Sequence, residues 1–290
     1  MSKSLTKTQI ALKRAYSTSD VAVLVATFMT FFLMTSVYFV VSYLTGEDFA
    51  QASGIDILVG IVGALLAGGM LFIAILLFGM FLVRMMRQTI LGNSLQIEYS
   101  NYAWLRDWSN HVAADLRMPR VEIFVTQDPV INAYAFGFIN PYCIVLNSGT
   151  IRYLTREELK VIVVHEMAHI KYGHTVASVY LQPFMSLPVV GAIAQWLAGF
   201  WQRRAELTAD RLALMYTEDS TLVKEALIKV HVGPDVAKAM NQIAQDWLQY
   251  TSERPMNRFA QTFSSHPFLV RRLSHLDRWK SIVEPATNEN

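Results

Sequence analysis

The stretch that most constrains the fold of this chain covers residues 161–170 and reads VIVVHEMAHI. It holds two histidines four residues apart, His165 and His169, with Glu166 directly after the first. On an α-helix, residues at this spacing lie on one face, about 40° apart around the axis. The chain must therefore fold so that one largely apolar helix presents two neighbouring imidazoles to a common partner.

The pattern His-Glu-x-x-His is typical of zinc hydrolases, in which two neutral imidazoles hold the metal ion and a nearby carboxylate takes a proton from its bound water. Glu166 would then lie beside the metal as the general base. The alternative is an ordinary buried helix with two satisfied histidines. Thr155 and Glu158 form a capping-box pattern and Gly173 is a plausible stop, so a helix is predicted over residues 155–173. This signalled start favours an active helix over the alternative.

Two long uncharged runs predict that part of the chain lies in a membrane. The first covers the 24 residues at 21–44 and the second the 27 residues at 57–83, and each is long enough to span a bilayer. The hydrophobic content of 53% is also too high for an ordinary soluble enzyme. No small-residue cleavage site follows the first run, so we expect an uncleaved anchor rather than a signal peptide.

Basic residues flank this pair of runs only at its outer ends. Residues 1–20 carry four Lys or Arg, two arginines follow the second run, and the loop at residues 45–56 has none. By the positive-inside rule, both outer ends face the cytoplasm. We therefore expect a cytoplasmic N-terminal segment at residues 1–20, a transmembrane hairpin at residues 21–87 and a cytoplasmic domain at residues 88–290.

The cytoplasmic domain is predicted to be mainly helical with a small β-sheet, so the fold class is α+β. Residues 88–118 look helical, and a turn at residues 137–141 joins the last two of the predicted strands. Strands are expected at residues 121–126, 132–136 and 142–147, and further helices at residues 205–216, 235–250 and 269–279.

A catalytic zinc ion usually takes three protein ligands, so a third must come from elsewhere in the chain. His174 is one candidate, but the extended histidine motif fails, because it would need glycine at Tyr172 and histidine at Thr175. On a continued helix, His174 would also point about 180° away from His165. We therefore expect His174 at the helix end or behind the ligands.

A downstream helix offers a better candidate in Glu206, with Asp210 one turn later on the same face. Glu206 would bind the metal, and Asp210 would accept the second ring N–H of a ligating histidine, which fixes the orientation of the imidazole. The alternative is that both acids pair with Arg203 and Arg211 on a solvated face. The His-Glu-x-x-His segment favours the metal interpretation.

A third charge-free stretch, at residues 175–202, lies between these two candidate ligand helices and contains Pro183 and Pro188. A single membrane crossing would put the histidines and Glu206 on opposite sides of the bilayer, where they could not share an ion. Two crossings need more length, since helical legs of about 12 residues rise only about 18 Å against a hydrocarbon core of about 30 Å. We therefore predict a broken helical hairpin, packed on the domain or re-entrant in the cytoplasmic leaflet.

Other features argue against several classes of function. The net charge is +2, and no Lys/Arg cluster with interleaved aromatic residues suggests a nucleic-acid surface. The single cysteine, Cys143, cannot form an internal disulfide, and its apolar surroundings favour a buried structural thiol over a catalytic nucleophile.

Four motifs in a fixed order resemble those of the HtpX-like and CAAX-prenyl-protease-like integral-membrane zinc metalloproteases, which are gluzincins. They are Asn132-Ala133-Tyr134, His165-Glu166-Met-Ala-His169 followed by Gly173-His174, Arg204-Ala-Glu206-x-x-x-Asp210, and His266-Pro267 with Arg272. Two amino-terminal spans precede them, as in HtpX. The resemblance implies a zincin-type metallopeptidase domain, with its active helix, behind two transmembrane helices.

The resemblance implies that His165, His169 and Glu206 bind one zinc ion and that Glu166 is the general base. The chain also departs from the family's pattern. HtpX proteins carry two further spans between the histidine helix and the glutamate helix, and the interval here is too short for them. The four-span topology is therefore not expected.

Two further motifs carry roles only through the resemblance. His266 and Arg272 would help to stabilise the oxyanion that forms as water attacks the carbonyl. For His266, the alternative is the start of a surface helix before a proline. Asn132, Ala133 and Tyr134 would hold the substrate backbone extended by strand addition.

The implied function is that of a membrane-anchored zinc endopeptidase that cuts membrane or misfolded proteins in protein quality control. The HtpX-like start favours a bacterial inner membrane, with the N-terminus and the catalytic domain in the cytoplasm. Expected partners are protein or peptide substrates, above all membrane proteins, and the lipid bilayer, with no nucleic acid. Two alternatives stay open: a membrane scaffold with a structural zinc site, which the complete set of catalytic residues argues against, and a membrane zinc hydrolase for another bond.

Overall fold

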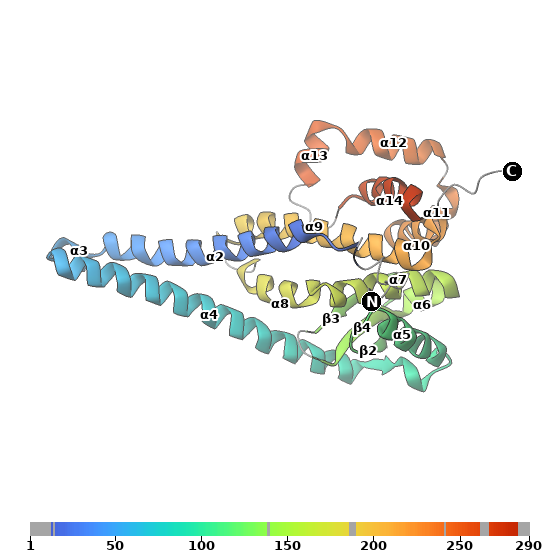
Figure 1. Ribbon diagram of the computed structural model, residues 1–290, viewed down its shortest axis with the longest axis horizontal. Coiled ribbons are helices and arrows are strands. Elements are labelled where there is room, and N and C mark those ends of the chain that lie inside the picture. The colour runs from blue at the N-terminus through green and yellow to red at the C-terminus, as the bar shows by residue number, and fades with distance from the viewer. Residues whose placement is uncertain are drawn as a thin grey trace, which may run out of the picture.

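The structure, a computed structural model, describes residues 13, 15–137, 140–185, 190–240, 242–261 and 267–283. A long helical hairpin projects from a body of helices that carries a small sheet on one side (Figure 1). The predicted α+β class with mainly helical content is confirmed.

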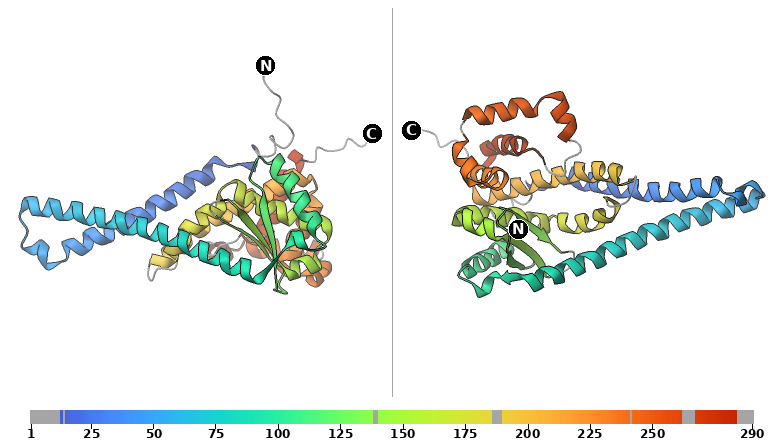
Figure 2. Two further views of the ribbon diagram at one scale, coloured as in Figure 1. Left: turned by 90° about the horizontal axis from the view of Figure 1, so that it is seen from below. Right: turned by 180° about the vertical axis from the view of Figure 1, so that it is seen from behind.

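The hairpin consists of α2, Thr18–Leu44, and α4, Gly54–Asn93, joined by the short helix α3, Glu47–Ala50. Both long helices are long and apolar enough to cross a membrane. They approach closely at Gly68, because a Cβ there would lie 2.7 Å from Ser36 Cα. Beyond the second uncharged run, α4 continues into the body, where it ends beside the sheet (Figure 2).

The helix predicted over residues 88–118 is wrong in its middle part. After α4 the chain forms the strand β1, Ser94–Gln96, and the 3-10 turn η1, Ile97–Tyr99, before the helix α5, Ala103–Asp115. The reason is tertiary, since β1 pairs antiparallel with β2, Val121–Thr126, and the first residue of η1 is buried in the core. The apolar residues that suggested a helix belong to a strand pair and to the core.

The sheet has four strands in the order β1-β2-β4-β3. β4, Tyr142–Asn147, runs parallel to β2, and β3, Ala133–Phe136, runs antiparallel to β4, with Ala133 opposite Leu146. All three strands predicted from the sequence are confirmed. Among the described residues β3 is an edge strand, paired on one side only.

The helix with the two histidines is α7, Arg156–Lys171, which follows the short helix α6, Ser148–Tyr153. Its predicted cap is present: the Thr155 N–H donates to Glu158 Oε2 over 2.8 Å, and the Glu158 N–H donates to Thr155 Oγ1 over 3.3 Å. Gly173, with a φ of +74°, follows its end in the left-handed conformation that glycine favours. α7 is buried along most of its length between the sheet, α5 and α9.

The charge-free stretch lies in α8, His174–Met185, and in the first half of α9, Val190–Thr217. Residues 186–189, including Pro188, lie outside the described residues. α9 also covers residues 205–216, which were predicted as a separate helix. Together with α2, this pair of helices forms a second apolar core of Phe31, Ala177, Leu181, Ala198, Trp201 and Ala205.

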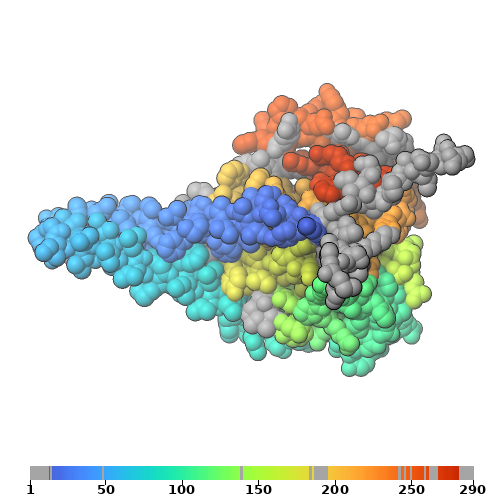
Figure 3. All heavy atoms as spheres, viewed as in Figure 1, coloured from blue at the N-terminus to red at the C-terminus, as the bar shows by residue number. Residues whose placement is uncertain are grey.

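The C-terminal part is helical. Its helices are α10, Ser220–Val232, α11, Pro234–Ala239, α12, Gln242–Ser252, α13, Pro255–Gln261, and α14, Leu269–Val283. The single helix predicted over residues 235–250 is wrong, because Met240 takes an extended backbone conformation between α11 and α12. α14 packs on α9 and α10, and α12 packs on α14 at the outer edge of the body, next to α13 (Figure 3).

We predict that Gly149→Ala destabilises the folded protein by about 1–3 kcal/mol through overpacking. Gly149 lies in α6 against the loop before β3, and a Cβ there would lie 2.1 Å from Pro129 O. The unfolding temperature in detergent measures the effect. Gly92→Ala is the control, because nothing lies within 4 Å of a Cβ at Gly92 and alanine is the better helix former. Equal unfolding temperatures for the two variants would contradict this packing.

Candidate metal centre

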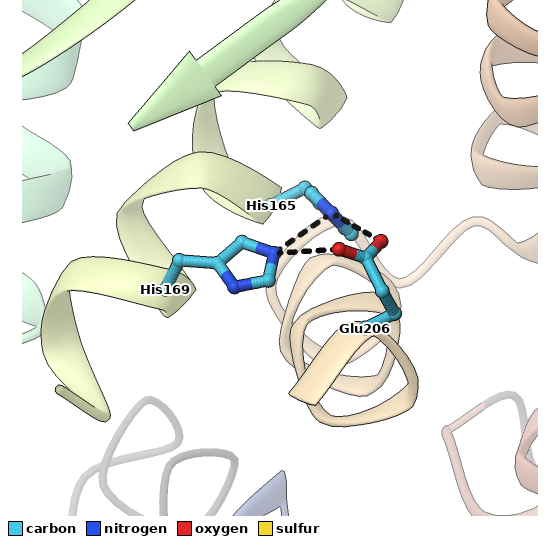
Figure 4. Close-up of side chains that lie close together, drawn as sticks. All are labelled: His165, His169 and Glu206. Atoms are coloured by element: carbon cyan, nitrogen blue, oxygen red, sulfur yellow. Dashed lines mark hydrogen bonds and ion pairs between the residues drawn. The ribbon is translucent and has the colours of Figure 1, made fainter. Parts of the chain in front are cut away.

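Two histidines of α7 and one glutamate of α9 converge on a single point (Figure 4). The Nε2 atoms of His165 and His169 lie 3.2 Å apart, and each lies 3.5 Å from an oxygen of Glu206. The candidate ligand atoms of the three residues all lie within 4.8 Å of one another. The arrangement follows from the helix period, since both imidazoles leave α7 on the face that meets α9.

Asp210 lies one turn after Glu206 on α9 and is completely buried. Its Oδ1 atom lies 3.0 Å from Nδ1 of His165, the ring nitrogen on the side away from Nε2. A carboxylate at this position holds a histidine in the orientation that leaves Nε2 available to a metal. Asp210 therefore lies behind one of the candidate ligands.

Arg272 of α14 holds both carboxylates of α9. Its Nε and Nη2 atoms donate to Asp210 over 2.7 and 2.6 Å, and its Nη1 atom lies 3.3 Å from Glu206 Oε2. Bidentate pairs of this kind are among the strong ion pairs of proteins. Although burial opposes ionisation, Arg272 and His165 hold the pKa of Asp210 below its ordinary value, so this carboxylate stays charged.

The electrostatics of the cluster favour a bound cation. Burial disfavours a charged imidazole, yet Asp210 and Glu206 together raise the pKa of His165 to about 10. Burial lowers the pKa of His169 to about 4, so this ring is neutral and keeps a free lone pair. Two imidazole nitrogens and one carboxylate oxygen are a common donor set for catalytic zinc. The residues present therefore fit a zinc ion.

Glu166 lies beside this cluster and is not one of its three candidate ligands. Its side chain is nearly buried, and burial raises its pKa to about 7. The backbone of Ala135 in β3 and the guanidinium of Arg272 act in the opposite direction and lower this pKa, but burial outweighs them. A carboxylate with a pKa near neutrality can both take up and release a proton at that pH.

His174 lies behind His169. Because α7 ends at Lys171 and α8 begins after Gly173, the chain turns and brings Nδ1 of His174 to 3.1 Å from Nδ1 of His169. Burial and the neighbouring His169 lower the pKa of His174 to about 3, so its ring is neutral. A neutral ring at this distance can accept the Nδ1–H of His169, which leaves Nε2 of His169 facing Glu206.

The cluster opens into a cleft of about 1310 Å³. One wall is β3 with Asn132 directly before it, so the predicted substrate residues Asn132, Ala133 and Tyr134 all line the cleft, and other walls come from α4, α8, α9 and α10. His231 of α10 also lines the cleft and was missed by sequence reasoning, since no local pattern distinguishes it. Gln202 was missed too, although its spacing of four residues from Glu206 placed it on the same face of α9.

The structure brings most of the predicted site residues together. The two histidines, Glu166, Glu206, Asp210 and Arg272 lie at one place, whereas His266 lies outside the described residues. The alternative in which both acids of α9 pair with arginines on a solvated face is not observed, because Asp210 is buried against Arg272 and Arg211 donates instead to the backbone oxygen of Ala15.

Comparisons with known proteins match this arrangement to one family. The chain matches peptidase family M48 over residues 100–199 and 183–280. It is 31% identical to the plastoglobule-localized metallopeptidase 48, chloroplastic, of Arabidopsis thaliana, over 67% of this chain and 62% of that protein. It is 27% identical to a protease HtpX homolog of Moorella thermoacetica, over 59% of this chain and 69% of that protein.

A crystal structure of S. mikatae Ste24p has a TM-score of 0.49 and 19% identity to this chain, over 71% of this chain and 58% of that chain. The sequence matches are stronger. The family match covers more than half of the chain and includes both histidines and Glu206 of the candidate metal centre. The chain therefore belongs to peptidase family M48, a family of metallopeptidases.

Proposed function

We propose that this chain is a membrane-anchored zinc endopeptidase with one zinc ion held by His165, His169 and Glu206. The proposal rests on one observation: these ligand atoms converge in a cleft that also contains Glu166 and the edge strand β3. A scaffold with a structural zinc site would need neither a buried carboxylate with a pKa of about 7 nor a cleft beside it. These features favour turnover.

Zinc, when bound, acts as a Lewis acid that polarises the scissile carbonyl and activates water. Glu166 would take the proton of the attacking water and pass it to the departing amine. Asp210 would hold His165 in its binding orientation. Arg272 would hold both carboxylates of α9 in place.

An oxyanion role for Arg272 and His266 stays a prediction. Two nitrogens of Arg272, Nε and Nη2, donate hydrogen bonds to Asp210, and the third, Nη1, lies 3.3 Å from Glu206 Oε2. The described residues do not include His266. A donor at this position would stabilise the negative charge that develops on the carbonyl oxygen.

We further propose that the substrates are membrane or misfolded proteins, bound as an extended strand beside β3. Asn132, Ala133 and Tyr134 line the cleft, and an edge strand can pair with a peptide backbone. Val83 and Met86 of α4, one of the two helices long enough to cross a membrane, line the same cleft. The cleft would then open next to the bilayer, in a bacterial inner membrane by analogy with HtpX.

The proposed topology places α7, α8 and α9 on one side of the bilayer. Their candidate ligands lie within 4.8 Å of one another, so the two helices that carry them cannot be separated by a membrane. α8 has 12 residues, which rise about 18 Å against a hydrocarbon core of about 30 Å. The hairpin of α8 and α9 would therefore pack on the body or enter one leaflet only.

We predict that Glu166→Gln keeps its zinc but loses about 10²- to 10⁴-fold in kcat, because an amide cannot act as the general base. Metal analysis and hydrolysis of a denatured protein, measured on one preparation, check both parts. Glu157→Gln is the control, since Glu157 is an exposed residue of the same helix. A zinc-free Glu166→Gln protein would instead make Glu166 a ligand.

We predict that Glu206→Ala loses zinc affinity more than Asp210→Ala, for which a loss of about 10- to 100-fold is expected. Glu206 would be a direct ligand, whereas Asp210 would act through His165. Chelator competition measures the zinc Kd, with Glu225→Ala on the exposed face of α10 as the control. Full zinc affinity in Glu206→Ala would remove Glu206 from the ligand set.

We predict that Gln51→Cys and Gln195→Cys, in a Cys143→Ser background, react with an impermeant thiol reagent from opposite sides of the membrane. Both glutamines are exposed, whereas Thr175 is buried and reports less well. A reagent added on the side that labels position 51 should reach position 195 only after the membrane has been permeabilised. Labelling of both positions from one side, in an active enzyme, would contradict the topology.

A further inference from the structure

The start of the membrane hairpin is packed into the body that carries the metal centre. Ala15 is completely buried in the main apolar core, and Asp20, in the first turn of α2, is only 7% exposed. A buried carboxylate is costly unless it is paired and hydrogen-bonded. Asp20 finds its partners on α9.

Asp20 contacts two residues of α9 that are one helical turn apart. Arg204 Nε donates to Asp20 Oδ1 over 2.7 Å, and Thr208 Oγ1 donates to Asp20 Oδ2 over 2.6 Å. Arg211, one turn further along, donates to Thr208 Oγ1 over 2.6 Å and to the backbone oxygen of Ala15 over 2.9 Å. The segment from Ala15 to Asp20 therefore follows α9 for two turns.

These contacts are made by the face of α9 that is opposite to Glu206, the candidate ligand. Arg204 and Thr208 lie on one side of the helix, and Glu206, halfway between them in sequence, points roughly 180° away. α9 is thus held between Asp20 on one face and the histidines of α7 on the other. A rotation of α9 that carried Glu206 away from the histidines would break the contacts with Asp20.

The same segment also reaches the end of α7. The ring centroid of Tyr16 lies 5.8 Å from that of Tyr172, and the ring centroid of Tyr172 lies 5.9 Å from that of His174. His174 in turn lies 3.1 Å from His169, measured between the Nδ1 atoms. The residues that precede α2 therefore contact α9 and Tyr172, the residue that directly follows α7.

We propose that Asp20 is a positioning residue for the metal centre, because its ion pair with Arg204 and its hydrogen bond with Thr208 fix α9 where Glu206 meets the histidines. This inference rests on the proposed zinc site. The proposal makes the start of α2 part of the structure that holds the candidate zinc ligands in place. A domain that began at residue 88 would lack this support.

The test uses the full chain in detergent micelles and measures zinc affinity by chelator competition. Asp20→Asn removes the charge with little change in size, and we expect the zinc Kd to rise about three- to tenfold, near the lower end of effects seen for residues behind metal ligands. We expect kcat to fall while KM changes little, since Asp20 does not line the cleft. Arg204→Gln should act alike, and the double variant should add little, because both changes break the same ion pair between Asp20 and Arg204.

Asp56→Asn is the matched control. Asp56 is also a carboxylate in the first turn of a hairpin helix, where it caps α4 together with Ser53, at the far end of the hairpin from α9 (Figure 1). This variant should keep the zinc affinity of the wild type. A measured unfolding temperature for every variant separates zinc affinity from general stability.

Each outcome decides one question. A wild-type protein that binds no zinc would overturn the proposed function itself. A wild type that binds zinc, with an equal zinc Kd in Asp20→Asn, would overturn the positioning role even if the unfolding temperature fell. If Asp20→Asn is recovered only as an aggregate, Arg204→Gln decides by the same criterion, because its side chain is one-third exposed and tolerates substitution better.

Discussion

The arrangement of the body depends on two carboxylates, Glu206 and Asp210, that lie one turn apart on α9. Buried charges require partners, and removing one partner of a buried pair is strongly destabilising. Here the partners come from two other helices, His165 of α7 and Arg272 of α14. Arg272 contacts both carboxylates and Glu166 lies beside them, so the carboxyl groups of this cluster outnumber the guanidinium. The cluster therefore favours a further positive charge, either on His165 or as a bound cation.

The sequence predicted those features whose causes are local or periodic. Thr155 and Glu158 cap α7 within a single turn, and the spacing of Glu206 and Asp210 placed both acids on one face before any packing was known. Features that depend on contacts between distant parts of the chain could not be predicted from the sequence. β1 exists because it pairs with β2 some thirty residues later, and nothing near His231 in the sequence indicates that this side chain meets the cleft. Arg272 was found through resemblance alone.

The hairpin of α8 and α9 shows that an uncharged composition does not by itself identify a membrane span. It has no charged residue between positions 175 and 202, so hydropathy alone would make it a membrane span. Yet Ser178 and Gln182 of α8 and Gln195 and Gln202 of α9 all line the cleft, and the last two lie on the same helix face as Glu206. Polar but uncharged side chains of each helix thus line the cavity beside apolar ones such as Val179 and Trp201, whereas Leu181 and Ala198 pack in the apolar core with α2. The hairpin is amphipathic without carrying charge.

With α2 crossing the bilayer as proposed, the contacts of Asp20 would also set the height of the candidate metal centre above the membrane. Asp20 in the first turn of α2 holds Arg204 and Thr208, which flank Glu206, so the candidate zinc site lies level with the start of α2. α2 has 27 residues and is about 40 Å long, against a hydrocarbon core of about 30 Å. With α2 crossing the bilayer as proposed, only about 10 Å of helix is left to extend beyond the hydrocarbon core at its two ends together. The site would therefore lie close to the membrane surface, within reach of peptide bonds just outside the bilayer.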